Sequence, residues 1–106
     1  MSRRTFAIAA ALSVLALESP FITFNANPLP RQYFNQGVKK YEAGNYRGAI
    51  DDWSKAIEIN PQNASAYLNR GIARELVNDL AGACSDWRKA ADFGLKEPAQ
   101  WVKNQC

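Results

Sequence analysis

Apolar residues recur at steps of three and four along two stretches of this 106-residue chain. An α-helix turns once every 3.6 residues, so this spacing places each set on one helix face. Turn residues interrupt the pattern once in each stretch, at Gly44-Asn45 and at Asn78-Asp79. The pattern therefore predicts an all-α protein. The predicted helices cover residues 31–43, 46–59, 64–77 and 80–93.

The two stretches are copies of one another at an offset of 34 residues. Nine positions are identical over one period without a gap. A fixed period of about 20–50 residues is the signature of a repeat protein. The sequence therefore predicts two helix–turn–helix units, residues 31–63 and 64–97. The identical pairs are Tyr33/Tyr67, Asn35/Asn69, Gly37/Gly71, Gly48/Gly82, Ala49/Ala83, Asp52/Asp86, Trp53/Trp87, Lys55/Lys89 and Ala56/Ala90.

At these positions the chain resembles the tetratricopeptide repeat (TPR) family, over residues 30–97. The family pattern is an aromatic, then Gly or Ala, an aromatic or Leu, Ala, an aromatic, Ala and Pro at fixed spacing. The second unit departs from it with Leu95 in place of Pro. The resemblance implies a right-handed α-solenoid fragment. The matching residues are Tyr33, Gly37, Tyr46, Ala49, Trp53, Ala56 and Pro61, then Tyr67, Gly71, Leu80, Ala83, Trp87 and Ala90.

The end of the chain, residues 98–106, resembles the start of a third unit. Pro98 stands two periods after Pro30, and Trp101 takes the aromatic position of the repeat. A terminal repeat needs a cap over its last apolar face. We therefore expect a capping helix over residues 98–104. The aromatic stripe of Tyr33, Tyr67, Trp53, Trp87 and Trp101 is expected to form core, because it falls at helical spacing.

The two cysteines, Cys84 and Cys106, meet if the capping helix packs antiparallel to the helix before it. A hairpin centred near residue 95 or 96 brings position 106 opposite position 84. A disulfide there would stabilise the fold by about 3 kcal/mol through chain entropy. The alternative is that Cys84 is a small buried residue and Cys106 a free thiol.

The first 26 residues have the pattern of a secretory signal peptide. Arg3 and Arg4 precede the apolar run Phe6–Leu17, which is shorter than the about 20 residues that span a bilayer. We therefore expect an exported protein of the periplasm, a lumen or the extracellular space, with residues 27–30 as a linker. A small exported bacterial TPR protein fits this pattern. The alternatives are a membrane anchor formed by residues 6–24 and a cytosolic tail.

The composition argues against catalysis. The chain has no histidine, no Cys-x-x-Cys pair and no Gly-rich phosphate loop, so we expect no enzyme activity, no metal and no cofactor. Without residues 1–26 the chain has 11 basic and 9 acidic residues, a net charge of +2, and the basic residues are spread over both units, which argues against nucleic-acid binding. The helical carboxylates are expected to lie on solvated, salt-bridged faces. They include Asp51, Asp52, Glu58 and Asp86.

The TPR resemblance implies that the first helix of each unit lines a concave surface for a protein or peptide. Asn35 and Asn69 could bond a peptide backbone there, or bond neighbouring helices and order the stack. Phe34 and Val38 stand where chaperone-binding relatives need Lys and Asn, so a carboxylate clamp is mostly absent. The residues that map to the surface are Phe34, Asn35, Val38, Tyr41, Glu42, Leu68, Asn69, Ile72, Glu75 and Lys103.

Two functions remain open at this stage. The first is a non-enzymatic module that binds a protein or peptide on the concave face, in the assembly of a complex. The alternative is a structural, self-associating module of the cell envelope. In that case the incomplete third unit would stack on another copy, and Trp101 and Val102 would be covered. Membrane contact is expected only through the N-terminal segment, if it is not cleaved.

Overall fold

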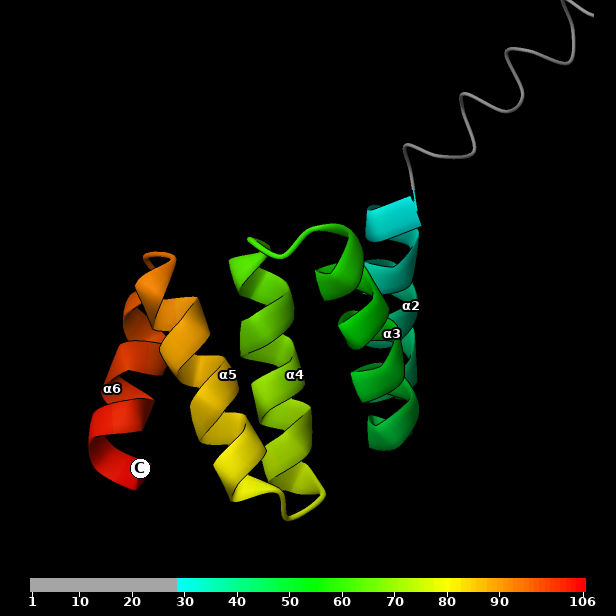
Figure 1. Ribbon diagram of the computed structural model, residues 1–106. Helices are drawn as coiled ribbons and strands as arrows, with labels where there is room; N and C mark the ends of the chain where they lie inside the picture. The colour runs from blue at the N-terminus through cyan, green and yellow to red at the C-terminus, as the bar shows by residue number, and fades with distance from the viewer. Residues whose placement is uncertain (1–28) are drawn as a thin grey trace, which may run out of the picture.

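The computed structural model describes residues 29–106, and five α-helices with no strand make up that range. The helices pack in chain order, each against the one before it (Figure 1). The all-α prediction is confirmed. The expected signal peptide or anchor, residues 1–26, lies outside the described residues. The helices are α2 (Leu29–Glu42), α3 (Tyr46–Ile59), α4 (Ala64–Leu76), α5 (Leu80–Asp92) and α6 (Lys96–Gln105).

The helix bounds differ from the predicted ones by two residues at most. The largest differences lie at helix starts, where α2 and α6 each begin two residues before the predicted position. Leu29 and Pro30, expected in a linker, are therefore helical. Proline lacks an amide hydrogen but is tolerated in the first helical turn, so the helix extends on the N-terminal side of both Pro30 and Pro98.

Polar side chains cap the N-termini of three of the helices. Each capping oxygen accepts a hydrogen bond from the backbone amide three residues later, at 2.9–3.1 Å. Each hairpin turn, before α3 and before α5, contains one residue in the left-handed backbone conformation: Gly44 with φ 83° and Asn78 with φ 68°. Glycine and asparagine adopt this conformation most readily. The capping residues are Asn45, Asn63 and Asp79.

Each helical hairpin closes by packing an indole ring on a glycine. Trp53 lies on Gly37 in the first hairpin and Trp87 lies on Gly71 in the second. A Cβ atom added to either glycine would fall 2.5 Å from the indole Nε1, which is closer than real Cβ contacts. The two tryptophans are only 2% and 1% exposed. No residue larger than glycine therefore fits opposite either ring.

The hairpins stack through small side chains. Six alanines of α3, α4 and α5 are fully buried, which lets the helix backbones approach closely. Beyond the second hairpin, Trp101 of α6 packs edge-on against Trp87, with ring centroids 5.2 Å apart. The last helix therefore covers the end of the core, as the cap prediction requires. The buried alanines are Ala49, Ala56, Ala66, Ala73, Ala83 and Ala90.

The antiparallel packing of α5 and α6 brings the two cysteines together. The Cα atoms of Cys84 and Cys106 are 6.0 Å apart, within the usual range of about 4.4–6.8 Å for a disulfide, and the sulfur atoms lie at bonding distance. The register expected from the hairpin is therefore present. A bond here would join the last residue of the chain to α5. Among residues 29–106, no helix has both the length and the apolarity to cross a bilayer.

Candidate functional site

A cleft of about 200 Å³ opens between the first helices of the two hairpins, α2 and α4. These are the helices that, by the TPR resemblance, are expected to line the concave surface. Since α2 and α4 belong to different repeats, the cleft exists only because the repeats stack. Its lining residues are Val38, Tyr41 and Glu42 from α2, Trp53 from α3, and Asn69 and Ile72 from α4.

The floor of the cleft is apolar and firmly packed. Trp53, predicted as core, is 2% exposed and also reaches the cleft. The Tyr41 ring lies 6.0 Å from the Trp53 ring and 5.2 Å from that of Tyr46, measured between centroids. Val38 packs against the same buried cluster, which includes Ala73 of α4. The floor is therefore part of the hydrophobic core, and a ligand would meet a preformed surface.

Two polar side chains, Asn69 and Glu42, lie among these apolar groups. Asn69 is half-buried and Glu42 is exposed. Within residues 29–106, neither side chain makes a hydrogen bond or an ion pair. The expected alternative, in which Asn69 bonds a neighbouring helix, has no such bond in this range. The cleft therefore offers an amide and a carboxylate to a ligand.

Asn35 and Asn69, which share one repeat position, lie in different surroundings. Asn69 on α4 faces the preceding repeat and lines the cleft, whereas Asn35 is exposed on α2 and lines no part of it. Residues 29–106 contain no repeat before α2, so position 35 has no cleft to face. The other mapped residues outside the cleft are Phe34, Leu68, Glu75 and Lys103.

These four residues have separate surroundings. Phe34 packs against Trp53, with ring centroids 6.4 Å apart, and its carbonyl accepts a hydrogen bond of 3.0 Å from the Trp53 Nε1. Leu68 is half-buried, and Glu75 and Lys103 are exposed. The cleft therefore gathers Val38, Tyr41, Glu42, Asn69 and Ile72 from the mapped set and adds Trp53.

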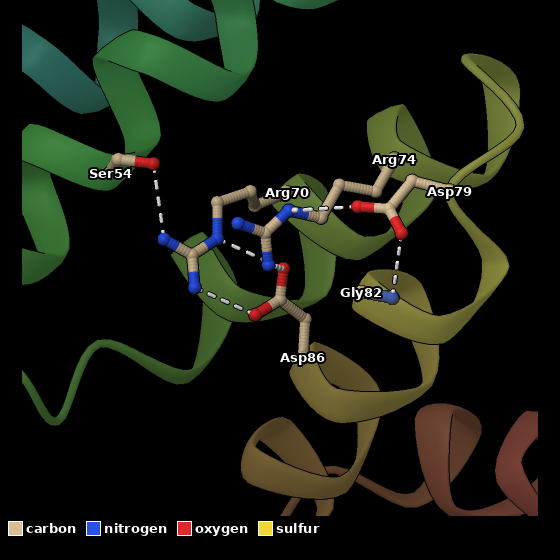
Figure 2. A network of polar contacts seen from close by, with 6 residues as sticks. All are labelled: Ser54, Arg70, Arg74, Asp79, Gly82 and Asp86. Carbon is tan, nitrogen blue, oxygen red and sulfur yellow. Dashed lines mark hydrogen bonds and ion pairs between the residues drawn. The ribbon is translucent and has the colours of Figure 1, made fainter.

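Arg70 on α4 bonds both neighbouring helices, through a buried aspartate on α5 and a serine on α3 (Figure 2). Asp86 is 2% exposed and accepts two hydrogen bonds from the Arg70 guanidinium, at 2.7 and 2.9 Å. The Arg74 guanidinium donates a third, at 3.0 Å. Arg70 also donates to Ser54 Oγ on α3, at 3.0 Å. One guanidinium therefore joins α3, α4 and α5, and such bidentate, charge-assisted bonds fix geometry well.

The first repeat has a weaker counterpart. Asp52 is 4% exposed, and its Oδ2 lies 2.9 Å from the Lys40 ammonium, an ion pair without the geometry of a hydrogen bond. The prediction of solvated carboxylates is therefore wrong for Asp52 and Asp86, although Asp51 and Glu58 are exposed. The signal was in the spacing, since each buried aspartate lies three residues after one buried alanine and four before the next, on the inner helix face.

Among residues 29–106, no group of three or more metal-ligating side chains is present. The cleft itself presents apolar walls, one amide and one carboxylate, and lacks a nucleophile paired with a base. Its arrangement is suited to binding a ligand.

Comparison with protein families matches residues 37–76 to the model described as TPR repeat. The matched span runs from the middle of α2 through α4, and it contains all six residues that line the cleft. No curated protein shows significant similarity to the chain.

Replacing Asp86 tests the importance of the polar network. Asp86→Asn removes the charge that faces two guanidinium groups, whose side chains are only 15% and 25% exposed. We expect the free energy of unfolding to fall by about 3 kcal/mol, because breaking a buried pair leaves uncompensated charge. The control Asp52→Asn should cost about 1 kcal/mol, since the 44% exposed Lys40 regains water. Urea unfolding measures both; equal losses would contradict the account.

Proposed function

Because this chain is a tetratricopeptide repeat protein, we propose that it binds an extended segment of another protein in the cleft between α2 and α4. Tetratricopeptide repeats generally mediate protein–protein interaction. The observation that carries the proposal is the cleft itself, whose six lining residues all lie within the matched span. We further propose that the protein works without catalysis, as a module in the assembly of a complex.

The chemistry of the cleft supports an extended peptide as the ligand. Val38 and Ile72 supply apolar contacts on opposite walls, and Asn69 carries both a donor and an acceptor. A peptide backbone has the same two groups at every residue, so one amide side chain can pair with it twice. Apolar walls with a few placed polar groups are the usual make-up of ligand sites.

Self-association through α6 has less support. The Trp101 ring already packs against Trp87 of its own chain. What remains near the end of the stack is a shallow surface around Val102, Ala99 and Ala91. That surface lacks an aromatic anchor of the kind that usually dominates the binding energy of protein interfaces. We therefore favour the cleft over self-association.

Paired substitutions of the two equivalent asparagines test the binding site. The probe is a decapeptide selected from a displayed random library against the full chain, and its affinity is measured by calorimetry. We expect Asn69→Ala to weaken binding about five- to tenfold, because it removes hydrogen bonds to the peptide. Asn35→Ala is the matched control and should leave the affinity unchanged, since Asn35 lies outside the cleft. Equal effects, or a library that yields no binder, would contradict the proposal.

Export of the protein and oxidation of Cys84 with Cys106 form a second part of the proposal. The basic residues before an apolar run support export, and the 6.0 Å Cα separation supports the bridge. An oxidising compartment would allow the bond to persist.

Intact mass of the protein from its own host tests this part. We expect a chain that starts near Asn27 and takes up no alkylating reagent until it is reduced. The reduced sample, alkylated in the same way, is the control and should gain two adducts. A full-length chain with both thiols already reactive would refute export and the bridge together.

A further inference from the structure

The cleft contains one charged side chain, and it is acidic. Glu42 is exposed at the cleft and has no ion-pair partner within residues 29–106. Three basic side chains of α2 and α4, those of Lys40, Arg70 and Arg74, form ion pairs with buried aspartates and do not line the cleft. Although the whole chain carries a net charge of +3, the local charge at the cleft is therefore negative.

An aromatic ring lies beside this carboxylate along the same helix. Tyr41 is half-buried, lines the cleft, and is held in position by the rings of Tyr46 and Trp53. The face of an aromatic ring carries negative electrostatic potential and attracts ammonium and guanidinium groups. The carboxylate and the ring therefore favour the same kind of ligand group, a cation.

The walls of the cleft suit the rest of such a side chain. Lysine and arginine carry an aliphatic stem that packs on apolar surface while the charged end stays near water. Val38 and Ile72 provide that apolar surface, and Glu42 is solvent-exposed. An apolar recess with an exposed carboxylate matches this two-part side chain.

We propose that the cleft accepts a lysine or arginine side chain from the bound segment. The stem lies between Val38 and Ile72, and the charged end lies near Glu42 and the ring of Tyr41. This inference rests on the proposed function and names the chemistry of the partner: a segment with a basic residue that enters the cleft. An acidic segment, or one ending in a carboxylate, is disfavoured because it would meet Glu42.

Three synthetic peptides test the choice of charge. They are octapeptides with blocked ends, identical except for a central lysine, norleucine or glutamate. Norleucine keeps the aliphatic stem of lysine and lacks its charge. The difference in affinity between the two peptides therefore measures the electrostatic contribution to binding. Binding to the full chain is measured by fluorescence anisotropy of labelled peptides. We expect the lysine peptide to bind about fivefold more tightly than the norleucine peptide, and the glutamate peptide most weakly.

Two variants assign the preference to Glu42. Glu42→Gln should remove most of the difference in affinity between the lysine and norleucine peptides, leaving only the contribution of the Tyr41 ring. Glu58→Gln removes an exposed carboxylate outside the cleft, and this control should keep the fivefold difference. Raising the salt concentration to about 1 M should also reduce the difference, because the screening length falls to about 3 Å.

The possible failures are distinguishable. If all three peptides bind equally well, the basic side chain is the wrong ligand while peptide binding stands. If the full lysine preference survives Glu42→Gln, the placement of the charged end near Glu42 is wrong, and peptide binding again stands. If none of the three peptides binds while the library-selected decapeptide does, this inference is refuted and the peptide-binding function stands.

Discussion

The fold depends on an indole ring that lies directly on a glycine backbone, once in each repeat. Trp53 on Gly37 and Trp87 on Gly71 bring the two helices of each hairpin close together. The same contact sets the binding surface, since Trp53 is both a core residue and part of the cleft floor. A change that displaced this ring would therefore alter stability and binding together.

The polar contacts add a second level of order between repeats. Hydrophobic packing is non-directional, and it leaves stacked hairpins some freedom to slide. The Arg70 guanidinium removes that freedom, because it bonds Asp86 within its own repeat and Ser54 in the preceding one. The network thus helps to fix how the two repeats that form the cleft sit against one another.

The repeat, the helices and the hairpin register could be predicted from sequence because each has a local signal. The helical spacing, the turn residues and the 34-residue period all appear in the chain itself. Cys84 and Cys106 lie side by side because α5 and α6 pack antiparallel. The position of the turn between the two helices is enough to predict which residues lie opposite one another.

The prediction that Asp52 and Asp86 are exposed was wrong. A charged side chain is expected to face solvent unless a buried partner is known, and the sequence alone does not identify that partner. The cleft was only partly predictable for a similar reason. Asn35 and Asn69 occupy one repeat position, but only Asn69 has a preceding repeat to face within the described chain. Composition and spacing alone do not show which of the two asparagines lines a cleft. That depends on whether another repeat packs against the one that carries it.

The most direct test of the account is to map the bound peptide by NMR. The library-selected peptide is titrated into isotope-labelled full-length protein, and backbone amide shifts are followed. The account predicts that the largest shifts fall on α2 and α4, at Val38, Tyr41, Asn69 and Ile72. Shifts gathered on α6, or on the exposed faces of α3 and α5, would contradict the assignment of the cleft as the binding site.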